Sequence, residues 1–117
     1  MDQKTYVDFF RQTSPYIHSH RGKTFVIALS GDAVVEPNFH STIHDIALLQ
    51  SLGIRIVVVH GAKSQIDKRL TEANIEPLFE HNVRITDAST MHVIKEVVGS
   101  TRLAIEAEFS TGLPNSP

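Results

Sequence analysis

The sequence predicts an α/β domain built around a parallel β-α-β unit. Apolar runs lie at residues 24–29 (TFVIAL) and 54–60 (IRIVVVH), and runs without polar alternation are typical of strands buried on both faces of a parallel sheet. Between them, apolar residues recur at helical spacing from Phe39 to Leu52, and Gly53 follows as a helix stop signal. A strand, a helix and a strand in this order predict parallel pairing with a right-handed crossover.

The N-terminal segment carries the pattern of an amphipathic helix. Tyr6, Phe9 and Phe10 lie at i, i+3 and i+4, which is the spacing of one helical face. The Ser-Pro pair at 14–15 predicts the start of a second short helix at an angle to the first, and Gly22 predicts its end. Because a cluster of exposed aromatic side chains is unfavourable in water, we expect it to bury against this domain or a neighbouring subunit.

The second half of the chain predicts two further helices with a short segment between them. Residues 63–74 have a helical pattern, and residues 75–85, which are short and mixed, predict a loop or a small hairpin. Asp87 is a good N-cap for a long helix that either reaches Ser110 or breaks near Gly99. Two strands are too few for a doubly wound sheet. The sequence therefore predicts either strands from a partner chain or, as we favour, the front part of a larger domain.

Length and composition limit the functions that the chain can have. Its 117 residues suit one domain, with 41% hydrophobic and 21% charged residues as in a typical globular protein. The net charge of −2 argues against nucleic-acid binding by bulk positive charge, and no apolar run approaches the roughly 20 residues of a membrane span. The absence of cysteine excludes disulfides, cysteine-ligated zinc and thiol catalysis. Without a signal-peptide pattern, we expect a cytoplasmic protein that binds neither nucleic acid nor membrane.

The turns that follow the two predicted strands are the candidate ligand site. Ligands in open α/β sheets bind beyond the carboxyl ends of the strands, where this sequence has Gly31 after the first run and Gly61 and Lys63 after the second. Free backbone N–H groups at the start of the following helices can hold an anion. Ala62 stands where a P-loop needs glycine, so this is not a P-loop. Ordinary strand-to-helix turns without a ligand are the alternative.

Arg84 is a candidate carboxylate ligand just before the predicted helix at Asp87. A guanidinium can bind a carboxylate through two hydrogen bonds while the helix dipole adds positive potential; the alternative is a surface pair with Asp87 or Glu80. His40 and His44 have a spacing that can chelate a metal, but without an assured third ligand we expect surface histidines and no metal site. Neither paired carboxylates for acid–base work nor a nucleophile elbow is evident, so no catalytic residue is predicted.

In their order along the chain, these motifs resemble the amino-acid kinase family. The strings TFVIALSGDA, GIRIVVVHGAKSQID and HNVRITDA are similar to its N-acetylglutamate kinase branch. The stretches FRQTSPYIHSHRGKTFVIAL and HDIALLQSLGIRIVVVHGAKSQID resemble more closely the kinase-like domain of the bacterial N-acetylglutamate synthases, which is joined to a C-terminal acetyltransferase module. The resemblance runs from about Phe10 to Pro117. It implies the front part of an amino-acid-kinase-like fold, with a parallel β-α-β core, flanking helices and an N-terminal helix.

Two departures from the true kinases argue against phosphoryl transfer. The kinases carry a lysine on the first strand that neutralises phosphate charge, where this sequence has Ala28. They follow the second strand with three glycines that cradle phosphates, where this sequence has residues 61–63, Gly-Ala-Lys. A residual acyl-phosphate kinase is therefore disfavoured. The resemblance implies instead a vestigial kinase-type pocket formed by Gly31, Gly61, Lys63 and Arg84.

The synthase resemblance implies a function for the whole enzyme and a smaller role for this segment. Family synthases transfer an acetyl group from acetyl-CoA to L-glutamate in the first step of arginine biosynthesis, and their kinase-like domain binds L-arginine as a feedback inhibitor and builds the homo-oligomer. By this resemblance, residues 1–22 form an oligomerisation and regulatory helix segment, and residues 23–117 form a partial kinase-like domain without the acetyltransferase module. We expect no cofactor in this chain and no activity from the chain alone.

Tyr16 is the residue that we assign to the arginine site through this resemblance. Its ring could pack on the guanidinium of the effector, whereas the alternative is a core residue at the bend of the predicted helices. A stand-alone, non-catalytic arginine-binding module is the alternative function. The sequence does not separate that module from the front part of a synthase.

Overall fold

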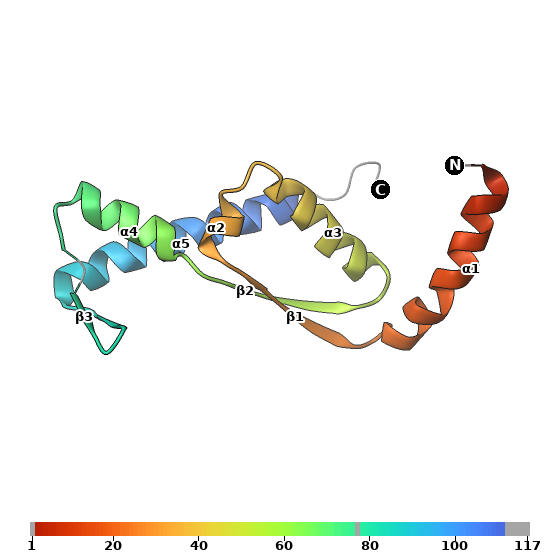
Figure 1. The fold of residues 1–117 in the computed structure, drawn as a ribbon, viewed down its shortest axis with the longest axis horizontal. Helices are drawn as coiled ribbons and strands as arrows, with labels where there is room; N and C mark the ends of the chain where they lie inside the picture. Colours follow the sequence, from red (N-terminus) through yellow and green to blue (C-terminus); the bar gives the residue numbers. More distant parts are fainter. Residues whose placement is uncertain (1, 77, 112–117) are drawn as a thin grey trace.

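The computed structural model describes residues 2–76 and 78–111, which form one parallel strand pair, one hairpin and a set of helices (Figure 1). The predicted α/β class is confirmed. In chain order the elements are α1 (Gln3–His20), β1 (Thr24–Leu29), α2 (Gly31–Val34), α3 (Phe39–Ser51), β2 (Arg55–His60), α4 (Lys63–Glu72), β3 (Leu78–Glu80), β4 (Val83–Ile85) and α5 (Ala88–Ser110).

The predicted β-α-β unit is present, with β1 and β2 parallel and α3 between them in the chain. The register runs from Thr24 opposite Arg55 to Leu29 opposite His60. The connection from α3 back to β2 turns at Gly53, whose φ of +93° lies in the left-handed region that glycine adopts without steric cost. The short helix α2, directly after β1, was not predicted.

The core lies between this strand pair and the helices α3 and α5. The four buried residues of the cluster come from both helices: Phe39, Ile43, Ile46 and Ile105. Partly buried apolar side chains of the strands and of neighbouring segments pack against it, namely Ile27, Leu29, Val34, Ile56, Val58 and Phe109. Burial of these side chains is the main stabilising contribution that the described residues make.

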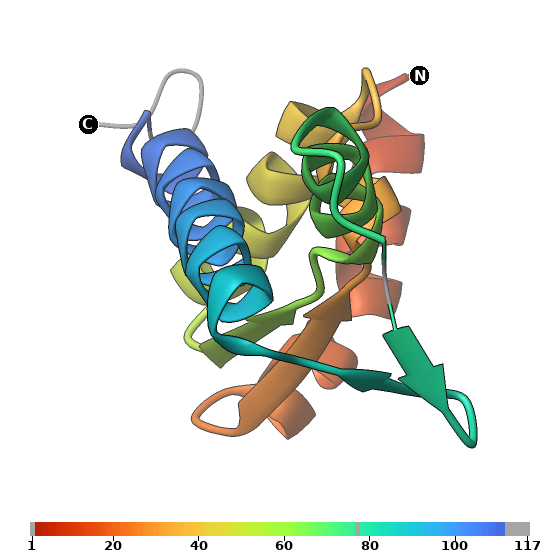
Figure 2. The same cartoon turned by 90° about the vertical axis from the view of Figure 1, so that its left-hand side faces the viewer.

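The prediction that both strands are buried on both faces is wrong for this chain. Accessibility alternates along β1 and β2, and Val26 is 67% exposed. The reason is that α3 and α5 cover the same side of the strand pair, as Figures 1 and 2 show. Among the described residues no element covers the opposite face, which therefore presents Val57 and Val59 as well as Val26 to solvent.

The helix α1 stands apart from the rest of the molecule at one end (Figure 1). It is a single helix with Pro15 inside it, so the predicted start of a second helix at 14–15 is wrong. Proline removes one backbone donor, and because this helix is exposed, water can satisfy the carbonyl group left without a partner. Asp2 caps the helix, and Gly22 follows its end with a φ of +81°. No residue of α1 is buried.

The remaining elements agree with the sequence patterns. The segment 75–85 contains the antiparallel hairpin β3–β4, which turns at His81 and Asn82, both with positive φ. Asp87 caps α5, which continues past Gly99 to Ser110, so the longer of the two predicted helices is present. Within the residues described here, no helix is both long and apolar enough to cross a membrane.

The molecule is much more extended than a compact domain of its length. Its radius of gyration is 19.3 Å and its principal extents are 60, 28 and 23 Å, whereas a compact domain of about 100 residues has a radius of gyration near 13 Å. The extension comes from α1 at one end and the hairpin β3–β4 at the other (Figure 1).

Candidate functional site

The two turns after β1 and β2 meet and form a small pocket at one edge of the strand pair. The backbone N–H of Gly61 donates to the carbonyl oxygen of Leu29 at 2.8 Å, which joins the end of one strand to the turn after the other. Ser30 caps α2 by accepting from the N–H of Ala33 at 3.1 Å. The pocket has a volume of about 290 Å³ and is lined by Ser30, Gly31, Asp32, Lys63, Ser64 and Asp67.

Gln65 links the first turn of α4, which follows the second of these turns, to the turn after β1. Its Nε2 donates to the carbonyl oxygen of Gly31 at 2.8 Å, and its Oε1 accepts from the hydroxyl of Ser64 at 3.0 Å. A Cβ atom on Gly31 would lie 2.4 Å from Oε1 of Gln65 and 3.0 Å from Cα of Ala62. Glycine at position 31 thus allows the close approach of Gln65 and of the turn before α4. Gln65 was not singled out from the sequence, because its partner lies 34 positions away.

The pocket is poorly suited to a phosphate group. Asp32 and Asp67 both line it beside the single cation Lys63, and carboxylates repel an anionic ligand. The N-cap of α4 is the buried Ala62, which offers no side-chain hydrogen bond to the first turn. Ala28, at the position where the resemblance places the lysine of the kinases, lies on β1 opposite Val59.

Arg84 pairs with Asp67 and not with Asp87 or Glu80, so the expected surface pair needs correction. Its Nη2 donates to Oδ1 of Asp67 on α4, and its guanidinium lies 5.2 Å from the centre of the Phe79 ring. Asp87 is occupied as the cap of α5, and hydrogen bonds from Thr90 and Ser89 hold the pKa of its carboxyl below the ordinary value. Arg84 therefore adjoins the pocket through Asp67 and is not among its lining residues.

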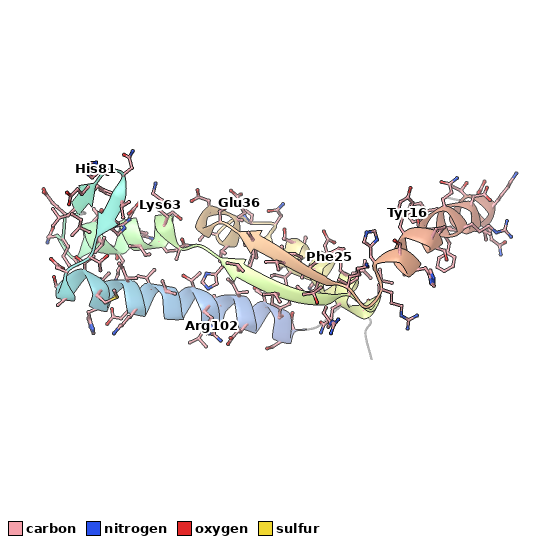
Figure 3. The ribbon with its side chains drawn as sticks, turned by 90° about the horizontal axis from the view of Figure 1, so that it is seen from below. Tyr16, Phe25, Glu36, Lys63, His81 and Arg102 are labelled. Atoms are coloured by element: carbon pink, nitrogen blue, oxygen red, sulfur yellow. The ribbon has the colours of Figure 1, made fainter. Side chains whose placement is uncertain are left out.

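Tyr16 lies on α1, well away from Lys63 of the pocket, as Figure 3 shows. It is 69% exposed, so in the described structure it is not the core residue of a helix bend that was the alternative to an arginine ligand. Its carbonyl oxygen lies 2.7 Å from Nδ1 of His20 in the last turn of the helix. The structure thus does not bring Tyr16 together with Gly31, Gly61, Lys63 or Arg84.

The histidine pair of α3 forms an aromatic contact. The rings of His40 and His44 are 5.8 Å apart and nearly perpendicular. In the part of the chain that the structure describes, no group of three or more His, Cys, Asp or Glu side chains is placed to hold a metal ion.

A second hollow, which the sequence did not predict, follows the free edge of β2. It has a volume of about 720 Å³ and lies between β2 and α5, with Ile56, Val58 and Phe109 among its apolar lining. Arg102 and Glu106 of α5, which form an ion pair at 3.1 Å, line it as well. Within residues 2–76 and 78–111, the strand pair therefore has an open apolar face and an open edge beside this hollow.

Comparison with known proteins extends these observations. The amino acid kinase family matches residues 23–112. The amino-acid acetyltransferase of Proteus mirabilis (strain HI4320) is 53% identical over 111 residues, which are 95% of this chain and 25% of that protein. Crystal structures of N-acetylglutamate synthase from Neisseria gonorrhoeae are also similar. The complex with coenzyme A and L-arginine has a TM-score of 0.81 and 29% identity over 96% of this chain and 27% of that one. The complex with coenzyme A and N-acetyl-glutamate has a TM-score of 0.76 and 31% identity over 88% of this chain and 24% of that one. The chain spans about a quarter of the length of these relatives.

Proposed function

The chain belongs to the amino acid kinase family, and from this premise we propose that it is the front part of the kinase-like domain of an N-acetylglutamate synthase. Such an enzyme transfers the acetyl group of acetyl-CoA to the amine of L-glutamate and yields N-acetyl-L-glutamate, in the first step of arginine biosynthesis. The observation that carries the proposal is the 53% identity to an amino-acid acetyltransferase over nearly the whole chain. The role of this segment is arginine sensing and assembly, and acetyl-CoA binds elsewhere in the enzyme.

The chemistry of the strand-end pocket supports a non-catalytic role. A kinase needs positive groups and open backbone where the phosphate is transferred, whereas this pocket has two carboxylates and one lysine. Ala28 and the buried Ala62 stand at the positions of the kinase lysine and of a phosphate-cradling glycine. We accordingly assign Gly31, Gly61, Lys63 and Arg84 to a vestigial kinase-type pocket, which Gly31 and Lys63 line and which Arg84 adjoins through Asp67.

The exposed apolar surfaces support a larger assembly. The uncovered face of β1 and β2 and the hollow beside β2 are surfaces that a doubly wound sheet covers with further strands and helices. The exposed aromatic side chains of α1, at Tyr6, Phe9 and Phe10, suit contact with a second copy of the protein. We assign residues 1–22 to this oligomer contact and residues 23–117 to the partial kinase-like domain.

The alternative is a stand-alone module that binds arginine without catalysis. An antibody to this segment distinguishes the two, because it reports the mass of the native protein in the source cells. We expect a band several times larger than 13.0 kDa, and we expect the captured protein to release coenzyme A from acetyl-CoA in the presence of L-glutamate. A band near 13.0 kDa together with arginine binding would support the stand-alone module. Glutamate-dependent release of coenzyme A by the pure chain would contradict a non-catalytic segment.

Tyr16 is the residue that we propose for the arginine site, since its ring is free to pack on a guanidinium. In the full-length enzyme, Tyr16→Ala should weaken inhibition by L-arginine and leave the uninhibited rate unchanged. Tyr16→Phe, which keeps the aromatic face, is the matched control and should retain inhibition. Equal inhibition of the wild type and Tyr16→Ala would contradict this assignment.

A further inference from the structure

The hairpin β3–β4 projects from one end of the molecule with almost no apolar anchor (Figures 1 and 2). All three residues of β3 are exposed, and in β4 only Arg84 is partly buried. The apolar side chains of the hairpin point largely into solvent: Leu78, Phe79, Val83 and Ile85. The turn at His81 forms the outer tip (Figure 3). Burial of apolar surface therefore does not explain how the hairpin keeps its place.

Arg84 supplies the attachment that apolar contacts do not. Its side chain is 17% exposed, bonds to Asp67 of α4 and covers the ring of Phe79 in the opposite strand of the hairpin. Among the ion pairs of the described residues, this is the one that joins the hairpin to another element. Nη1 of the same guanidinium is buried and has no acceptor within the described part of the chain. Loss of the carboxylate would thus leave a largely buried cation without compensation.

Asp67 connects this attachment to the candidate pocket. Its carboxylate lines the pocket together with Lys63 and accepts the hydrogen bond from Arg84. We propose that Arg84 is a positioning residue, which latches the hairpin to α4 and fixes Asp67 as a wall of the strand-end pocket. The planar guanidinium suits this task because it can cover an aromatic ring and bond a carboxylate at the same time.

Hydrogen exchange of the full 117-residue chain, read by mass spectrometry, tests the latch. In Asp67→Asn we expect amide exchange across 78–85 to accelerate on the order of tenfold, because a charge-assisted hydrogen bond that holds the segment closed is lost. Exchange in β1 and β2 should stay as in the wild type. Asp67→Glu keeps the carboxylate and should retain most of the protection, whereas Arg84→Lys keeps only the charge and should lose it.

A matched pair on α5 provides the control. Glu106→Gln removes the carboxylate of an exposed ion pair with Arg102 and should leave exchange in the hairpin unchanged. Unchanged exchange across 78–85 in Asp67→Asn would overturn the proposal. So would an equal acceleration in the hairpin and in β1 and β2, because the pair would then support the whole fold and not the hairpin.

Discussion

The two long helices α1 and α5 begin in the same way, but one is exposed along its whole length and the other is partly buried. Each starts with an aspartate followed three residues later by threonine: Asp2 accepts from the N–H of Thr5 at 2.7 Å, and Asp87 from that of Thr90 at 2.8 Å. No residue of α1 is buried. In contrast, α5 buries four residues along its length: Thr90, Val93, Thr101 and Ile105.

The difference between α1 and α5 distinguishes the role of local sequence, which starts a helix, from that of tertiary packing, which stabilises it. An N-cap and a periodic pattern suffice to start a helix, and both helices have them. Tertiary packing supplies most of the stability of a helix in a protein, and within the described structure only α5 has it. The aromatic stripe of α1 at Tyr6, Phe9 and Phe10 therefore has the pattern of a packed face, but no partner covers it among the residues that the structure describes.

Truncation of one apolar side chain in each helix should give the largest difference between α1 and α5 in the free energy of unfolding. Ile105 is 5% exposed in the core cluster, so Ile105→Ala should lower the free energy of unfolding by about 2–5 kcal/mol through lost burial and a residual cavity. Phe10 is 66% exposed, so Phe10→Ala should change it by less than about 0.5 kcal/mol. Urea unfolding at a protein concentration too low for association measures both. Similar losses in the two variants would show that α1 packs in solution.

The elements that were predicted correctly are determined by residues close to one another in the chain. The apolar run 24–29 became β1 with the same bounds, and the cap at Asp87 started α5 at the next residue. The turn at Gly53 likewise needed only its own backbone geometry. These signals are complete within a few residues, so periodicity and capping rules can detect them.

The features that the sequence did not predict depend on groups distant in the chain. Arg84 of β4 was expected to bind a ligand or a nearby carboxylate, yet its partner Asp67 lies 17 positions earlier, on the helix α4. The bond from Gln65 to Gly31 spans 34 positions. Burial of the strands was overestimated for a related reason, since an apolar run indicates that a face is suited to burial but not which element covers it.

Removal of the N-cap side chain from each of the two helices should change the stability less than the core truncation does, and again differently for α1 and α5. Asp87→Ala should lower the urea midpoint of global unfolding, because α5 unfolds together with the core that it covers. Asp2→Ala removes an equivalent cap from a helix with no buried residue, so it should lower the helical circular dichroism slightly and leave the global midpoint in place. An equal fall of the midpoint in both variants would contradict the independence of α1.

The pH dependence of the urea midpoint should also differ between the two capping aspartates, Asp87 and Asp2. Hydrogen bonds from Thr90 lower the folded-state pKa of Asp87 below 3.8, and those from Thr5 do the same for Asp2. A lowered pKa contributes stability that is present above the ordinary value and is lost as pH falls below it. Between about pH 5 and pH 3, the wild type should therefore lose more of its urea midpoint than Asp87→Ala, which has no carboxylate to protonate. Asp2→Ala should follow the wild type, because the proton taken up at α1 changes a helix whose melting is not coupled to the core.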